Sequence, residues 1–289
     1  MPGEEVIRIG ILKLGCIGAA SLIEYILDER AERDDIEVRS FTSGAKMDEA
    51  SADDTVKYIL EYKPAFAIVV SPNAALPGPT KAREALKDAA IPALTISDAP
   101  SSKKLYKKDD EGKKIPNPPE GQGFLILTAD SMIGARKEFL DPTEMVLFNS
   151  DMLKVLAVTG YMRVIHNVIE EAITAAKSGK TIEFPAITVD AGKALKEAGF
   201  TNPYARAKAH VAAVLAEQVA ELTTDGCFKQ SKPEKYIPLV AAGHEMLRTA
   251  ANLAAEAREM EKGQDSVFRT PHASDGKILE KTNLMDKPK

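Results

Sequence analysis

The stretch ILKLGCIGAA, residues 11–20, decides the fold of this chain. The apolar run that leads into it, residues 6–12, predicts a strand, and the residues after Gly18 have the periodicity of a helix. A strand, a glycine-containing turn and a helix form the first unit of a nucleotide-binding α/β fold. The dinucleotide fingerprint would require a glycine at Lys13, so this turn has two glycines and a cation in place of three glycines.

The same alternation continues along the first 140 residues. Ser21 and Glu24 have the spacing of a capping box and predict the start of the first helix. Strands separated by helices indicate βαβ units, which predicts an α/β fold with a mainly parallel Rossmann-like sheet and helices on both faces. The further strands are expected at 36–41, 66–70, 93–97 and 124–128, with helices at 51–62 and 80–90. Right-handed crossovers gather the loops after the strands along one ligand-binding edge of the sheet: 13–18, 71–79, 98–103 and 128–134.

From residue 141 the sequence is rich in helical patterns. We therefore divide the chain into an α/β ligand-binding domain, 1–140, and a helix-bundle segment with a small β tail, 141–289. Asp141-Pro142 predicts a helix start, and Gly160 predicts a break before the pattern resumes to about residue 176.

Three features of the second segment predict further elements. Pro185 in the run 182–189 indicates an edge strand. Two Ala-rich helices are expected, one starting at Asn202-Pro203 and one covering 238–262, and their small side chains suit either a bundle within the chain or a subunit interface. Asp275-Gly276 predicts a turn between short strands in the C-terminal tail.

The overall composition excludes several classes of protein. A net charge of -5 argues against a nucleic-acid-binding surface, and no apolar run approaches the roughly 18 residues of a membrane span. The acidic N-terminus that leads into a strand is not expected to be a signal peptide. Cys16 and Cys227 are far apart, which argues against a disulfide framework or a cysteine zinc site and predicts a cytoplasmic protein.

The stretch 104–122 interrupts the alternation with charged residues and prolines. Its composition is that of a mobile surface excursion, and the alternative is a lid over the adjacent ligand-binding edge.

The predicted ligand-binding edge is poor in groups for acid–base or nucleophilic chemistry. The four histidines all lie after residue 165, and His166, His210 and His244 each stand singly on predicted helices, as structural histidines usually do. Cys16 is either a reactive thiol at a helix N-terminus or a small apolar filler. The second strand ends without the acidic residue that would bind the ribose of NAD. Hydride transfer between two bound organic molecules suits such a site, because the cofactor carries the chemistry.

Several segments together resemble a known family, the coenzyme F420-dependent methylenetetrahydromethanopterin dehydrogenases. The resemblance runs from about residue 6 to residue 285, and the stretch 104–122 is longer than we expect of the family. The segments are GILKLGCIGAASLIEYILDERAERDDI, TSGAKM, SPNAALPGPTKAREAL, ISDAP, MIGARKEFLDPTEM, AGFTNPYARAKA, GCF, KYIPLVAAGHEMLR and RTPHASDGK.

The resemblance implies a function. A hydride would move reversibly between 5,10-methylenetetrahydromethanopterin and coenzyme F420, giving 5,10-methenyltetrahydromethanopterin and reduced F420, in the one-carbon metabolism of methanogenesis from CO2. It implies a dissociable deazaflavin, no metal, no tightly bound flavin, and a homohexamer in which the Ala-rich helices are buried between subunits. The alternatives are a nicotinamide-dependent oxidoreductase on the same sheet and a non-catalytic ligand-binding protein.

The edge and the resemblance together suggest roles for individual residues. Asp98 is expected to stabilise the methenyl cation electrostatically, with a helix N-cap as the alternative role. The tail motif starting at Arg269 either approaches the pterin or is structural. The expected cofactor-binding residues are Lys13, Gly15, Cys16, Ile17, Gly18, Ser71, Pro72, Asn73, Asp98, Ala99, Lys103, Thr128 and Asp130. The expected substrate-binding residues are Arg136, Lys137, Arg269, Thr270, Pro271 and His272.

Overall fold

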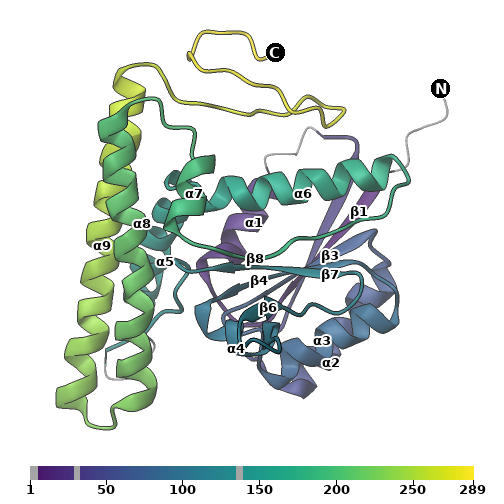
Figure 1. The fold of residues 1–289 in the computed structure, drawn as a ribbon, viewed down its shortest axis with the longest axis horizontal. Helices are drawn as coiled ribbons and strands as arrows, with labels where there is room; N and C mark the ends of the chain where they lie inside the picture. Colours follow the sequence, from purple (N-terminus) through teal and green to yellow (C-terminus); the bar gives the residue numbers. More distant parts are fainter. Residues whose placement is uncertain (1–5, 29–32, 135–138) are drawn as a thin grey trace.

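The computed structural model describes residues 6–28, 33–134 and 139–289. Figure 1 shows a central sheet with helices on both faces and a long two-helix arm at one end. The C-terminal tail runs along α6 (Tyr161–Lys177), on the side of the helix away from the sheet.

The sheet has six strands, and every neighbouring pair is parallel. The chain passes outward from β1 to β2 and then returns to the other side of β1 at β3, which makes the β1/β3 boundary a topological switch point. Ligands of open α/β sheets bind at such points, outside the carboxyl ends of the strands. In spatial order the strands are β2 (Ile36–Thr42), β1 (Ile7–Lys13), β3 (Phe66–Ser71), β4 (Ala93–Asp98), β7 (Gln122–Leu127) and β8 (Ala186–Val189).

The predicted edge strand is confirmed, because β8 lies at the end of the sheet and begins directly after Pro185. This strand comes from the second segment of the sequence but pairs with β7 of the first. The division of the chain at residue 140 stays a prediction.

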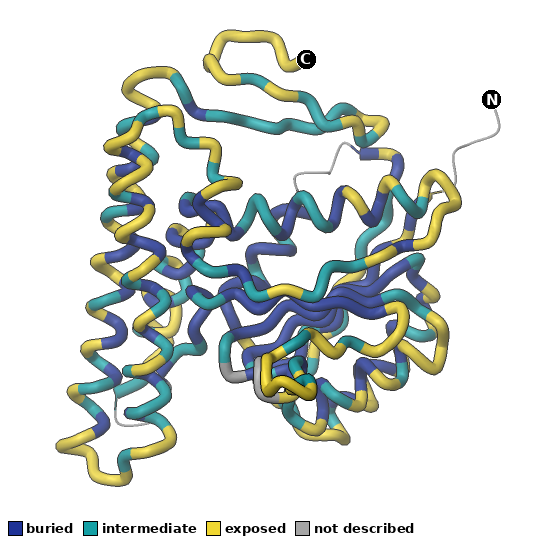
Figure 2. The backbone as a smooth tube through the Cα atoms, in the orientation of Figure 1, coloured by how far each residue is buried: buried dark blue, intermediate teal, exposed yellow. Residues whose placement is uncertain are grey.

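Alternate side chains of each inner strand enter two cores on opposite faces of the sheet. On β1, Ile9 and Ile11 enter one core, while Leu12 enters the other. The first face carries α1 (Gly18–Asp28), α5 (Pro142–Val158) and α6, and the second carries α2 (Glu49–Tyr62) and α3 (Pro77–Asp88). Strands buried on both faces are typical of parallel sheets, and Figure 2 shows them as the dark centre of the molecule.

Alanines form the contact between the two helices of the arm. α8 (Pro203–Thr224) and α9 (Pro233–Gly263) pack along each other, and buried alanines such as Ala212 and Ala254 allow the close approach. These alanines are therefore buried within one chain, as the bundle alternative predicts. α9 begins earlier than predicted, at Pro233, and contains Pro238 in its first turns.

The remaining helix starts and short elements refine the sequence predictions. Asp141 caps α5, and Gly160, with φ 104°, separates α5 from α6, as predicted. For α2, however, the helix begins at Glu49, capped by Asp48, and not at residue 51 as predicted. The short elements are η1 (Ala99–Ser101), α4 (Ser102–Leu105), β5 (Tyr106–Lys108), β6 (Lys114–Pro116), α7 (Ala191–Glu197) and a π-helical turn, η2 (Asp225–Lys229). The tail has two isolated antiparallel bridges about the predicted turn, Arg269 to Lys281 and His272 to Ile278.

The start of α1 differs from the prediction. The capping box at Ser21 and Glu24 is wrong, because the helix already begins at Gly18. Its cap comes from Asp130, whose Oδ1 accepts a hydrogen bond from Gly18 N and whose Oδ2 accepts one from Ala19 N, both at 2.8 Å. The first N–H groups of a helix have no partner within the helix, and a carboxylate also interacts favourably with the helix dipole there.

We expect Asp130→Ala to lower the free energy of unfolding by about 2 to 4 kcal/mol, because two buried N–H groups lose their acceptor. Asp141→Ala removes an exposed cap of the ordinary local kind and is the matched control, expected to cost about 1 kcal/mol. Asp130→Asn keeps one hydrogen-bond acceptor, so its loss in free energy of unfolding should fall between those of Asp130→Ala and Asp141→Ala. Urea denaturation followed by circular dichroism measures all three, and an equal cost for Asp130→Ala and Asp141→Ala would contradict the importance of this cap.

Candidate functional site

The loops after β1, β3 and β4 meet at the carboxyl edge of the sheet, as predicted. Leu14 N donates to Val70 O at 2.9 Å, which joins the turn after β1 to the end of β3. Ser97 Oγ donates to Ser71 O at 2.6 Å, and Ala74 N donates to Ser97 Oγ at 3.1 Å. The three loops therefore form one hydrogen-bonded rim at the switch point.

Gly15 lies where these loops approach each other most closely. Its φ of 91° is in the left-handed region that favours glycine. A Cβ at this position would lie 2.8 Å from both Pro72 Cδ and Met47 Sδ, so no larger residue fits. Of the neighbouring residues predicted to bind cofactor, Cys16 is exposed and Lys13 is half-buried at the end of β1.

Asp98 is a buried acid at the end of β4 with 1% of its surface exposed. Its Oδ1 accepts a hydrogen bond from Ala99 N at 2.6 Å, while its Oδ2 has no hydrogen-bond partner among the described residues. Burial raises the pKa of Asp98 well above its usual range. The N–H groups of Ala99 and Met132 oppose this shift, and the charge of nearby Asp130 adds to it. Burial therefore favours the neutral form of Asp98, and a buried oxygen without a partner marks a candidate functional group.

Asp130 is fully buried beside this acid. Burial raises its pKa to about 7, against the opposing effect of the N–H groups of Ala19 and Gly18. Both of its oxygens are already used by α1, so its position fits a role in holding the turn and not direct contact with a ligand.

A third polar group at the edge was missed from the sequence. Glu217, on α8, accepts hydrogen bonds through Oε1 from Thr128 Oγ1 at 2.5 Å and Ala191 N at 2.8 Å. Tyr161 OH donates to the same oxygen at 3.3 Å. This carboxylate connects the arm to the end of β7. In the sequence, Glu217 could be found as a charged residue one helical turn after the buried Ala213, on a helix face whose other side chains are small and apolar.

The charged stretch 104–122 packs against the sheet through Tyr106, near the start of the stretch. The Tyr106 hydroxyl lies 3.0 Å from the Thr188 hydroxyl, and its ring lies 5.2 Å from that of Phe124. A pocket of about 360 Å³ opens beneath the β5–β6 hairpin, and its lining includes two predicted cofactor-binding residues, Ala99 and Thr128. The hairpin thus forms one wall of a pocket at the sheet edge.

Three predicted cations cannot be placed at the site. Arg136 and Lys137 lie outside the described residues. Lys103 falls within α4, but its side chain is not among those described.

The model of one protein family, methylene-5,6,7,8-tetrahydromethanopterin dehydrogenase, matches residues 7–289 of this chain. The chain belongs to this family. An F420-dependent methylenetetrahydromethanopterin dehydrogenase of Archaeoglobus fulgidus is 55% identical over 285 residues, which cover 98% of this chain and 99% of that protein. The protein of the same description from Methanocaldococcus jannaschii is 49% identical over 284 residues, with the same coverage.

A solved structure of the same kind of enzyme has a very similar fold. It is a structure of F420 dependent methylene-tetrahydromethanopterin dehydrogenase in complex with methylene-tetrahydromethanopterin and coenzyme F420. Its TM-score to this chain is 0.90 at 41% identity, covering 99% of this chain and 100% of that one. The family resemblance drawn from the sequence segments is thereby confirmed. In this family member, no helix in the described part of the chain is long and apolar enough to cross a membrane.

The tail residues of this dehydrogenase lie away from the sheet edge. Arg269, Thr270 and Pro271 line a separate cavity of about 420 Å³ between α6, the end of α9 and the tail. None of the described cofactor-binding residues predicted at the sheet edge lines this cavity.

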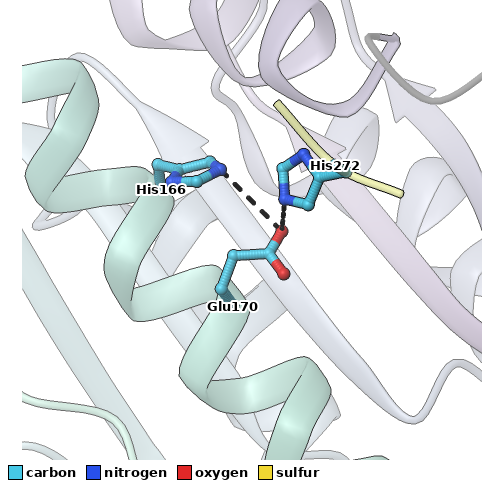
Figure 3. Close-up of side chains that lie close together, drawn as sticks. All are labelled: His166, Glu170 and His272. Carbon is cyan, nitrogen blue, oxygen red and sulfur yellow. Dashed lines mark ion pairs between the residues drawn. The ribbon is translucent and has the colours of Figure 1, made fainter. Parts of the chain in front are cut away.

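His272 belongs to a buried cluster with His166 and Glu170 (Figure 3). Its Nε2 lies 3.1 Å from Glu170 Oε1, and His166 Nε2 lies 4.0 Å from the same oxygen. His166 is therefore a buried histidine within a structural cluster, in line with the expected structural role, but periodicity within α6 gave no signal of its partner in the tail. Two imidazoles and a carboxylate within 4.8 Å have the composition of a metal site. Glu170 Oε1, however, also accepts from Arg33 Nη1 at 3.2 Å, and a guanidinium in that position opposes a cation.

The cluster instead links the C-terminal tail to the residues directly before β2, an edge strand of the sheet. Arg33 also forms a bidentate pair with Asp35, with both N–O distances 2.7 Å, and Lys177 Nζ lies 2.5 Å from the second oxygen of Asp35. The tail closes the contact, because Asp34 N donates to Ser274 O at 3.0 Å. Burial opposes the ionisation of Glu170, but His272 and Arg33 together lower its pKa below the usual range.

We expect Glu170→Gln to speed amide hydrogen exchange in the tail by about tenfold at neutral pH, because charge-assisted hydrogen bonds contribute roughly 1.5 kcal/mol or more. The amides to follow by mass spectrometry or NMR are those of Arg269, Ala273 and Lys281, which bond across the tail. The neighbouring exposed Glu171→Gln is the matched control and should leave exchange unchanged. Equal exchange in Glu170→Gln and the wild type would show that the cluster does not hold the tail.

The same contact should be sensitive to acid. Burial opposes ionisation of Asp35, but the bonds from Arg33 and Lys177 lower its pKa to about 2. Its stabilising contribution is therefore complete above the unfolded-state pKa of about 4 and is lost as the pH falls from 4 toward 2. Tail exchange, corrected for its intrinsic pH dependence, should be equal at pH 7 and pH 5 and rise only as the pH falls below about 4.

Proposed function

We propose that this chain catalyses reversible hydride transfer between 5,10-methylenetetrahydromethanopterin and coenzyme F420, giving 5,10-methenyltetrahydromethanopterin and reduced F420. The observation that carries the proposal is the match, along nearly the whole chain, to an enzyme solved with both ligands. The named relatives support the same activity, in the one-carbon metabolism of methanogenesis. A nicotinamide-dependent oxidoreductase or a non-catalytic binding protein is not favoured.

The residues at the switch point fit a dissociable deazaflavin. The rim is formed by glycine, proline and small polar residues, and the turn at Gly15 packs directly against Pro72 and Met47. The four histidines are not part of the described rim: they lie on α6, α8, α9 and the tail. When bound, coenzyme F420 supplies the ring that accepts the hydride, so the rim has to orient two ligands and exclude water.

We place the cofactor against three walls of the rim. Gly15 to Gly18 form the first wall, Ser71 to Asn73 the second, and Asp98 with Ala99 the third. Lys13 and Lys103 are placed near the anionic part of the cofactor, and Arg136, Lys137 and the tail motif with the substrate. Asp130 and Thr128 act as positioning residues, because their polar atoms are taken by α1 and by Glu217.

Asp98 is the residue we place next to the reacting carbon. A positive charge that develops beside a buried carboxyl favours the ionised form of that carboxyl, and the pair stabilise each other strongly in a site that excludes water. The raised pKa of Asp98 in the free protein is consistent with this role, since the charged form is stabilised only when the cation is present.

We further propose a cytoplasmic homohexamer. Cys16 and Cys227 are not joined in a disulfide, which suits a reducing compartment. The alanines of α8 and α9 are used within the chain, so the subunit contacts are placed on exposed apolar side chains, such as Val146 on α5 and Val211 and Val214 on α8.

The activity is tested with the purified protein. Addition of the methylene substrate should bleach the absorbance of oxidised F420, and addition of the methenyl product should restore it from reduced F420. NAD and NADP replace F420 in parallel reactions and should show no reduction. Binding of F420 without bleaching would favour a non-catalytic protein, and reduction of a nicotinamide instead would overturn the assignment.

Asp98→Asn should lower kcat by about 10²- to 10³-fold, the range for loss of one preorganised electrostatic group. The KM for F420 should stay within about twofold of the wild type, because the amide has the shape of the acid. Steady-state kinetics with each ligand varied in turn gives both numbers. Wild-type turnover in Asp98→Asn would remove Asp98 from the mechanism and leave it as a cap for Ala99.

A further inference from the structure

Three arginine side chains meet in the cavity beneath the tail. Arg163 from α6, Arg258 from α9 and Arg269 from the tail all line this space of about 420 Å³, together with Lys281. Glu261 is the single acidic residue in the lining. The chain as a whole carries a net charge of -5, so this concentration of positive charge is local and not a consequence of composition.

The carboxylate of Glu261 forms no ion pair with the three arginines. Its oxygens accept hydrogen bonds from Thr201 N at 2.8 Å and Asn202 N at 2.7 Å, and also from the hydroxyls of Thr201 and Ser266. Its charge is therefore used to hold the start of α8 and the turn after α9.

Two of the arginines are fixed in place by neutral groups. Arg163 donates to Thr270 Oγ1 at 3.2 Å and to Phe268 O, and its guanidinium lies 4.8 Å from the centre of the Phe268 ring. Arg269 Nη1 donates to Val267 O at 2.8 Å and to Thr282 O at 2.7 Å. A hydroxyl, carbonyls and a ring orient these side chains, and Glu197 and Glu280 act on Arg163 through their charge without forming an ion pair with it.

Arg258 has no such partner. With the residues that the structure describes it forms neither a hydrogen bond nor an ion pair, although it is half-buried. Burial lowers its pKa, and the charges of Arg269 and Arg163 lower it further, against the smaller opposing effects of Glu261 and Glu259. Arginine still remains charged at neutral pH, so the repulsion is present in the folded protein.

We propose that this cavity is an oxyanion site, in which Arg163, Arg258 and Arg269 together bind a phosphate or carboxylate group. Guanidinium groups form strong bidentate hydrogen bonds to both kinds of oxyanion, and a bound anion would replace three-way repulsion by attraction. The volume is in the range of small-molecule sites and exceeds what one phosphate requires. The anion is either free phosphate or the anionic tail of one of the two organic ligands, and only the second source rests on the proposed function.

Inorganic phosphate is the probe for the site itself. Scanning calorimetry of the wild-type protein should show a saturable rise in melting temperature of about 3 to 6 °C with phosphate, beyond that in sodium chloride of equal ionic strength. Arg258→Gln should abolish the phosphate effect. Arg206→Gln, which removes an exposed arginine on α8 outside the cavity, should retain it.

A purely structural role for Arg258 makes the opposite prediction about the anion-free protein. If Arg258 serves only to pack, Arg258→Gln should melt below the wild type in chloride. If it belongs to an oxyanion site, the substitution relieves repulsion and the variant should melt at the same temperature or higher. A phosphate response no larger than that of chloride, or one that survives in Arg258→Gln, would overturn the proposal.

Kinetics then identifies the source of the anion. If a ligand tail occupies the cavity, phosphate should compete with that ligand alone, and Arg258→Gln should raise its KM by about tenfold. If free phosphate is the occupant, the melting temperature should respond while both KM values stay constant. Both results support the site. Neither the calorimetric result nor its control depends on turnover, so failure of the proposed activity would leave this test intact.

Discussion

The two hydrogen bonds that Asp130 accepts from the start of α1 hold the ligand-binding edge together. They join the loop after β7 to the turn after β1, across β3 and β4 of the sheet. They also explain the second glycine of the turn, because a Cβ on Gly18 would lie 2.8 Å from Asp130 Oδ1 and 2.5 Å from Met152 Cγ. Gly15 is required for a different reason, its left-handed φ and the nearness of Pro72. Both glycines are thus explained by contacts within the protein, with no need for a dinucleotide.

The first turn of α6 separates a region of acidic side chains from a region of cationic side chains. Tyr161 points to the sheet edge, where Glu217, Asp98 and Asp130 supply acidic groups. Arg163, two residues later and therefore about 200° further around the helix, lines the cationic cavity beneath the tail. A cation and an anion would be attracted to different sides of the same helix.

The sequence was sufficient for the parts of the fold that depend on local patterns. The strands followed from apolar runs, the edge position of β8 followed from Pro185, and the break between α5 and α6 followed from Gly160. It failed where a side chain from a distant segment replaces a local signal. Asp130 caps a helix 112 residues away, so the nearby Ser21 was mistaken for the cap. His166 shows the same limit, because its partner in the tail lies more than 100 residues away in the sequence.

The loops at the ligand-binding edge were predictable because strand order alone brings them together, whereas the arginine cavity depends on how the tail lies across α6.

The fastening of the tail has a consequence for biosynthesis. Arg33 and Asp35 come more than 200 residues before His272 and Ser274 in the chain, so they leave the ribosome well before them. While the chain is being made, the charged groups near the start of β2 have no tail to cover them, so water keeps access to them until the tail has been translated. The tail therefore covers these groups only after the sheet is complete, and a chain that stops shortly before residue 270 would keep all six strands of the sheet but leave this buried contact open to water.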